Sequence, residues 1–189
     1  MSICTKIAAL AVAAFAVGAV PALAQDEMAH VKPATEYVKK HVESWLSDPV
    51  VIKAVEASNK AHAKLMQTEI DQLDKDWVAK KPELLDSTMK NPLAAFLTKK
   101  KEASGGVITE AFVMDDRGLN VGQTDGTSDF WQADEAKWQK SYGAGPGSIF
   151  VDKAEDDGGK KISQVSVTIS DKGKAIGAIT LGIDVGKLK

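Results

Sequence analysis

Apolar residues recur every three or four positions through the helical half of the chain. Between Pro49 and Trp77 they line one helix face, with lysine and aspartate at most other positions. The pattern predicts one long amphipathic helix over most of this range. Asp48 is expected to accept hydrogen bonds at its start, and Pro49 suits the first helical position because no donor is needed there. Pro82 and Pro92 are expected to start two shorter helices.

After Gly106 the apolar period becomes that of extended strands, separated by polar and glycine-containing turns. Strands are predicted over residues 107–114, 119–124, 148–153, 161–170 and 175–185, with a helical insert at 127–142. Strands that are apolar on both faces must be covered on both sides. The long helix is expected to cover one face and the insert the other. The predicted fold class is α+β, with a five-stranded antiparallel sheet.

The N-terminal segment has the layout of a secretory signal. Lys6 precedes an uncharged apolar run, Ile7–Val20, and a small-x-small pattern ends at Ala24. Cleavage after Ala24 is expected, giving a mature periplasmic chain of 165 residues. An uncleaved anchor helix is the alternative, although a membrane-spanning helix needs about 20 apolar residues. Either outcome puts the rest of the chain outside the cytoplasm.

Composition narrows the classes of function. Cys4 is the only cysteine and lies before the apolar run, so the mature chain is expected to have no disulfide, thiolate metal site or cysteine nucleophile. The formal net charge of −2 argues against a nucleic-acid partner. The mature length suits one core. Residues 25–106 are therefore predicted to form the helical region, and 107–189 the sheet, of one domain.

Three segments resemble parts of the Cache fold, also called the PDC or PAS-like extracellular sensor domain. Residues 112–121 (FVMDDRGLNV) resemble its first hairpin, 130–138 (FWQADEAKW) its ligand-side insert, and 167–177 (VTISDKGKAIG) its final hairpin. Members of the family are mostly ligand-binding ectodomains of chemoreceptors, histidine kinases and cyclic-dinucleotide enzymes. In such receptors a membrane helix follows the last strand, whereas this sequence ends at Lys189. The resemblance implies a free-standing sensor with a separate membrane receptor or histidine kinase as partner.

Aromatic residues gather in the expected insert. Trp131, Glu135, Trp138 and Tyr142 are spaced i, i+4, i+7 and i+11, and would share one face of a continuous helix. Aromatic faces with one carboxylate can enclose an organic cation, at about 0.5–2 kcal/mol for each ring. The alternative is that the aromatic rings simply cover the sheet as core, with Glu135 at the rim.

The charge of the expected ligand stays open from sequence. Arg117 is the only arginine and lies in a predicted turn, whereas the resemblance implies an arginine clamp for amino-acid ligands. A carboxylate would need Lys137, Lys140 or backbone N–H groups instead. The hypotheses are thus an amine or, less favoured by the residues, a carboxylate or amino acid.

Polar residues alternate along the fourth strand. Gln164, Ser166 and Thr168 form one face of it, and Asp152 lies on the neighbouring strand. These side chains are candidates to face a pocket under the insert. The alternative is a solvated sheet face.

Motifs for catalysis and for cofactors do not occur. The histidines are His30, His41 and His62, without metal-ligand spacing, and no G-x-S-x-G elbow is present. The glycines of residues 143–147 lack the Lys-Ser/Thr of a phosphate loop. The acidic run 152–158 misses the ligand positions of a calcium loop, and its residues 155–157 are expected to form a solvated turn. The predicted function is a non-enzymatic, small-molecule-binding sensor module without a cofactor. The alternative is a structural or interaction domain whose pocket its own side chains fill.

Overall fold

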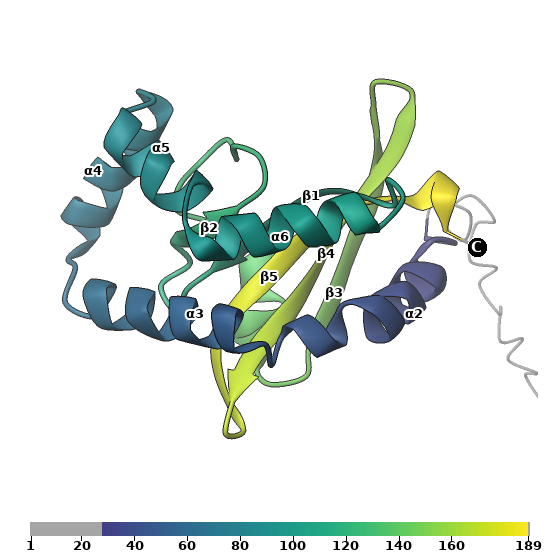
Figure 1. The fold of residues 1–189 in the computed structure, drawn as a ribbon, viewed down its shortest axis with the longest axis horizontal. Helices are drawn as coiled ribbons and strands as arrows, with labels where there is room; N and C mark the ends of the chain where they lie inside the picture. The colour runs from purple at the N-terminus through teal and green to yellow at the C-terminus, as the bar shows by residue number, and fades with distance from the viewer. Residues whose placement is uncertain (1–27, 189) are drawn as a thin grey trace, which may run out of the picture.

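The computed structural model describes residues 28–188, so the predicted signal sequence and Cys4 lie outside the described residues. A five-stranded antiparallel sheet, in the order β2-β1-β5-β4-β3, forms the centre of the molecule (Figure 1). The predicted α+β class and all five predicted strands are confirmed. The strands are β1 (Ile108–Met114), β2 (Asn120–Gln123), β3 (Ile149–Asp157), β4 (Lys160–Asp171) and β5 (Lys174–Asp184).

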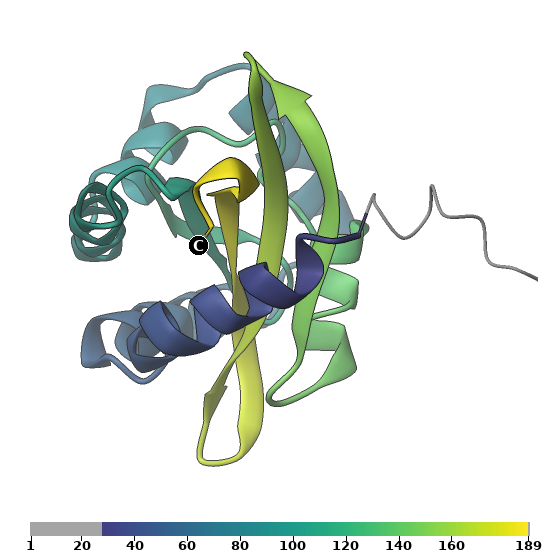
Figure 2. The ribbon, with the colours of Figure 1, turned by 90° about the vertical axis from the view of Figure 1, so that its right-hand side faces the viewer.

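Helices precede the sheet in sequence. They are α2 (Val31–His41), α3 (Pro49–His62), α4 (Gln67–Val78), α5 (Pro82–Met89) and α6 (Pro92–Ala103). Those of residues 31–41, 49–62 and 92–103 pack across one face of the sheet, whereas that of residues 67–78 packs against Leu119 and Phe130. The insert between β2 and β3 contains a short α7 (Ala136–Gln139) and lies on the opposite side of the sheet (Figure 2). The sheet is thus covered on both faces, as predicted. None of the helices within residues 28–188 is long and apolar enough to cross a membrane.

Proline and capping residues set the helix starts. The Asp48 carboxylate accepts a hydrogen bond from Val50 N at 2.9 Å, and Pro49 occupies the first turn of α3. Pro82 and Pro92 start α5 and α6, the latter with Asn91 as cap, accepting from Ala94 N at 2.8 Å. These local signals behave as the sequence predicts because each needs only its neighbours along the chain.

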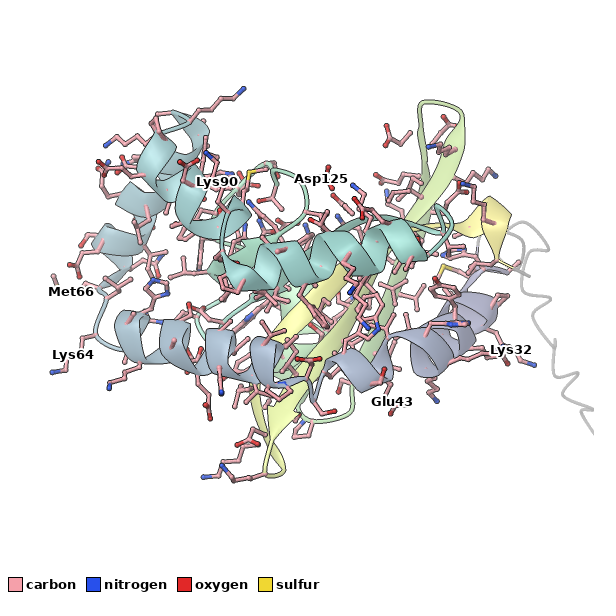
Figure 3. The ribbon with its side chains drawn as sticks, in the orientation of Figure 1. Lys32, Glu43, Lys64, Met66, Lys90 and Asp125 are labelled. Atoms are coloured by element: carbon pink, nitrogen blue, oxygen red, sulfur yellow. The ribbon has the colours of Figure 1, made fainter. Side chains whose placement is uncertain are left out.

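The single helix predicted over Pro49–Trp77 is wrong, because two helices occupy this range. α3 ends at His62, and α4 turns away from it (Figure 1). Met66, placed on the apolar helix face by its spacing, is 65% exposed and points outward between the two helices (Figure 3). The Arg117 guanidinium donates to the carbonyls of His62 and Leu65, at 3.4 and 3.0 Å. A side chain from the distant β1–β2 turn thus satisfies carbonyls that a continuous helix would have used itself.

The main core lies between the sheet and the helices α2, α3 and α6. Alternate residues of β4 and β5 point into it and are almost completely buried: Val165, Val167, Ile169, Ile179, Leu181 and Ile183. Gly177 allows β5 to lie close to β1 and α3, because a Cβ at this position would collide with Met114 O and contact Val55 of α3. The helical half and the sheet half of the chain therefore share one core.

Candidate functional site

The insert covers a sheet face that differs from the main core. Phe112 and Met114 of β1 and Ala178 of β5 are buried there, and Trp138 and Tyr142 of the insert pack on them. The two insert rings are 4.8 Å apart between centroids, and Trp138 Nε1 donates to Asp115 O at 3.2 Å. Burial raises the pKa of the Tyr142 phenol. Trp138 and Tyr142 therefore cover this part of the sheet while remaining partly exposed.

Trp131 lies apart from this pair, although its spacing suggested a shared helix face. The predicted helical insert between the second and third strands is confirmed, but α7 is four residues long and begins after Glu135, whose backbone is extended, so the helix does not continue over 127–142. Trp131 instead bridges to Leu119 and donates from Nε1 to Arg117 O at 3.0 Å. The structure brings two of the three predicted aromatic residues together, and they do not form a cage around an open space.

Polar side chains of β4 and β5 lie under the insert rather than in solvent. Ser166 Oγ is 2.9 Å from Thr180 Oγ1, and neither residue is exposed. Thr168 Oγ1 donates to Gly145 O at 2.9 Å, which anchors the glycine-rich end of the insert to the sheet. These hydroxyl groups satisfy one another or the backbone, so this part of the insert-covered face is filled.

A hollow of about 500 Å³ opens beside this filled region, toward the β3–β4 hairpin. We call it the acidic hollow, because six carboxylates and one lysine line it. Its residues are Glu110, Glu135, Asp152, Lys153, Glu155, Asp156, Asp157, Ile162 and Gln164. Three of the predicted site residues, Glu135, Asp152 and Gln164, thus meet at one place. They come from the insert and from two strands.

Lysines beside the acidic hollow are engaged with neighbouring groups. Lys137 Nζ is 2.9 Å from Glu135 Oε2 and 3.1 Å from Gln132 Oε1, and lies 5.5 Å from the centroid of the Phe112 ring. Its side chain is only 11% exposed. The hydrogen bond from Lys153 to Glu155 lowers the pKa of the Glu155 carboxyl. With six acids against one lysine in its lining, the hollow is strongly negative.

Two contributions to the acidic hollow were missed from sequence. Residues 155–157 were predicted to form a solvated turn. They instead extend β3 and pair with residues 160–162 of β4, so their carboxylates belong to strand residues. Glu110 of β1 reaches across Gly182 and accepts from Gln164 Nε2 at 3.1 Å. A Cβ at Gly182 would lie 2.7 Å from Glu110 Cγ, so glycine makes this contact possible. In the sequence, the signal for this role was that Glu110 carries a carboxylate within a mainly apolar strand.

His62 contacts the sheet half of the chain, although all three histidines lie in the helical half of the sequence. Its Nδ1 is 2.6 Å from Oδ2 of Asp115, a carboxylate with no exposed surface. The other oxygen of Asp115 accepts from Arg117 N and Leu119 N, both at 2.9 Å. This cluster joins the end of α3 to the β1–β2 turn. Among residues 28–188, no three His, Cys, Asp or Glu side chains are placed to share a metal ion.

Solved structures similar to the chain are sensor and ligand-binding domains. One is the ligand-binding domain of the Campylobacter jejuni chemoreceptor Tlp3 in complex with 4-methylisoleucine, with 16% identity and a TM-score of 0.40; the match covers 87% of this chain and 59% of that one. Another is the sensor domain of the V. cholerae histidine kinase DctB, with 14% identity, a TM-score of 0.39, and 87% and 57% covered.

A third is the ligand-binding domain of the Pseudomonas aeruginosa PAO1 chemoreceptor PctC in complex with GABA, with 11% identity, a TM-score of 0.40, and 88% and 62% covered. The chain thus spans roughly 60% of the length of these domains. No family model and no curated protein matches it. These structures are of the Cache sensor class that the sequence resembles. At such low identities and TM-scores, their ligands give no information about the ligand of this chain.

Proposed function

We propose that this protein is a periplasmic sensor module of Cache type that binds a small organic amine in the acidic hollow. The observation that carries the proposal is the excess of six carboxylates over one lysine around a space of about 500 Å³. Small-molecule sites commonly have volumes of about 300–1,000 Å³. The periplasmic location is inferred from the signal sequence predicted at residues 1–24.

The arrangement of charges favours an amine over a carboxylate. Each carboxylate in the lining repels an anion, and the repulsion grows where the site is partly desolvated. Lys137, which borders the hollow through Glu135, already contacts Glu135 and Gln132, and Lys153 of the lining pairs with Glu155. A primary amine is favoured over a quaternary ammonium, because carboxylates accept N–H hydrogen bonds and no aromatic cage surrounds the hollow. A diamine would bind more tightly than a monoamine, because carboxylates of the lining would pair with the ammonium groups at both of its ends.

A separate membrane receptor or histidine kinase would sense the bound state. The acidic hollow borders the insert through Glu135, so an amine bound there would compete with Lys137 for this carboxylate. Release of Lys137 from Glu135 is one way in which binding could alter the insert surface. The partner would recognise that change.

The rival hypothesis, a structural or interaction domain, also has support. Trp138 and Tyr142 pack on Phe112, and Ser166 pairs with Thr180, so side chains of the chain fill the centre of the insert-covered face. This leaves the acidic hollow as the binding space on that face. The two hypotheses therefore differ over whether this hollow binds a ligand.

Titration calorimetry and thermal shift with putrescine and succinate test the proposal, because these compounds match in chain length and differ in charge. Putrescine is expected to bind and succinate not to bind. A ligand at a hundred times its Kd should add about 2.7 kcal/mol to the free energy of unfolding. Glu110→Gln and Asp152→Asn should each weaken putrescine binding by about threefold to tenfold. Glu43→Gln is the matched control, since Glu43 points into solvent away from the hollow (Figure 3).

Two results would reject the proposal. Preferential binding of succinate that is lost in Lys137→Ala would show a site for anions. The absence of binding by putrescine and by a wider set of amines would favour the structural rival.

A further inference from the structure

A second hollow lies among the helices, with walls from α3, α4, α5, α6 and β2. Its volume is about 600 Å³, and it shares no residue with the acidic hollow. We call it the apolar hollow, because most of its lining is aliphatic or aromatic. The lining includes Ala54, Leu73, Leu84, Leu93, Val121 and Phe130. A concave, mainly apolar space of this size between helices suits a small molecule.

The apolar hollow lies where two hydrophobic clusters of the molecule meet. Leu93 and Val121 of its lining belong to the main core. Leu73, Leu84 and Phe130 belong to the smaller cluster built around α4 and α5. Leu73, Leu84 and Val121 keep part of their surface exposed. The protein's own side chains thus leave the space between the clusters unfilled, and an apolar molecule placed there would bury surface from both of them.

Charged groups are scarce in the lining of the apolar hollow. The described residues that line it include no carboxylate, and their lysine, Lys53, is exposed. An ammonium group in the hollow would lose hydration without gaining a partner of opposite charge, which is costly. A carboxylate would meet Lys53, but ion pairs with exposed side chains contribute little. The lining therefore favours an uncharged ligand over a ligand of either charge.

The uncharged polar side chains and the histidine of the lining are engaged with other groups of the protein. Each makes at least one hydrogen bond to a carboxylate, a hydroxyl or a backbone carbonyl: Ser58, His62, Ser87, Thr88, Asn91 and Asn120. Asn91, for example, donates to Val121 O at 2.7 Å and caps α6 by accepting from Ala94 N. Asn120 Oδ1 has no partner among the described residues, but its accessible surface is almost zero, so it is not offered to a ligand. Polar groups on a ligand would therefore add little to its binding.

We propose that the apolar hollow binds an uncharged, mainly hydrocarbon molecule, for example one with two fused aromatic rings. The molecule contacts Leu93 and Val121 on the side of the main core. It contacts Leu84 and Phe130 on the side of the smaller cluster, and so joins the two clusters. This inference goes beyond the proposed amine function, because both the ligand class and the lining residues differ from those of the acidic hollow.

Titrations with naphthalene, 1-naphthylmethylamine and 1-naphthoate test the inference, because the three compounds share one ring system and differ in charge. NMR titration, followed at the amides of Leu84 and Val121, should show naphthalene binding about tenfold or more tightly than either charged compound. Ala57→Phe and Ala61→Leu add bulk at two exposed lining positions of α3, and should weaken naphthalene binding by about tenfold or more. Ala95→Phe is the matched control, because Ala95 is exposed on α6 and does not line the hollow.

Three outcomes would overturn the inference. Equal or tighter binding of the amine or the carboxylate at these amides would reject an uncharged ligand class. Naphthalene binding that survives both filling variants would place the compound elsewhere on the molecule. Failure of all three compounds to bind would show that the hollow is not a ligand site. Putrescine binding should be unchanged in Ala57→Phe, so failure of this inference is distinguishable from failure of the proposed amine site.

Discussion

The two faces of the sheet use neighbouring residues of the same strands for different purposes. On β5, Ile179, Leu181 and Ile183 point toward the helices, while Ala178, Thr180 and Gly182 point toward the insert. On the helix side, these three β5 residues pack among the apolar side chains of the main core. The insert side holds paired hydroxyls, two aromatic rings in tilted contact and, at one end, the acidic hollow.

The contrast separates the face that supplies most of the core from the face on which we propose that a ligand binds. Successive side chains of a strand point to opposite faces, so a change at one position leaves the other face largely in place. The helix-covered face contributes most of the buried apolar surface. The insert-covered face can therefore vary in polarity without loss of the fold. Three sets of variants test this division, in order from the largest expected effect to the smallest.

Leu181→Ala should give the largest loss of stability. Leu181 is fully buried in the main core, and removal of such a side chain costs about 2–5 kcal/mol. Thr180→Ala, one residue away on the other face, leaves the buried Ser166 hydroxyl without its partner and should cost about 1–3 kcal/mol. Urea unfolding of both variants measures the difference. Equal losses would contradict the proposed division between the two faces.

The Ser166–Thr180 pair should give an intermediate effect. Ser166→Ala or Thr180→Val leaves one buried hydroxyl without its partner, at a cost of about 1–3 kcal/mol. The double variant removes both hydroxyls, so its loss should be smaller than the sum of the single losses. A double-mutant cycle by chemical denaturation measures the coupling. Strictly additive losses would mean that the two hydroxyls do not interact.

Asp116→Asn should give the smallest effect, and one that depends on pH. Asp116 lies in the β1–β2 turn, where its backbone N–H donates to Asn59 of α3. Burial, with the nearby Asp115 charge, raises its pKa against the opposing influence of Arg117 and His62. A raised pKa means that the folded state binds this proton more tightly than the unfolded state, so stability is lost as pH rises through the raised value.

The Asn variant keeps a neutral side chain and should therefore gain stability over the natural protein near neutral pH. The gain should vanish below about pH 3.9, the ordinary value for aspartate, where both side chains are uncharged. Thermal unfolding across this range measures the trend, with the exposed Asp134→Asn as control. A gain that is independent of pH would exclude ionisation of Asp116 as its cause.

The candidate site was only partly predictable from sequence. Glu135, Asp152 and Gln164 were expected near a pocket and do line the acidic hollow, whereas Glu110 was not expected there. Its position depends on β5 lying between β1 and β4, with Gly182 at the register where Glu110 and Gln164 meet. Strand order and register are long-range properties, and no spacing along the chain encodes them directly.

The sequence by itself determined the elements whose causes are local. Alternating apolar residues and glycine turns specify the five strands, and Asp48, Pro82 and Pro92 specify where helices begin. Tertiary structure decided the rest. The break between α3 and α4 depends on Arg117, which reaches their junction from a turn far along the chain. Helix propensity is worth a fraction of a kcal/mol for each residue, so a contact with a distant side chain can override it.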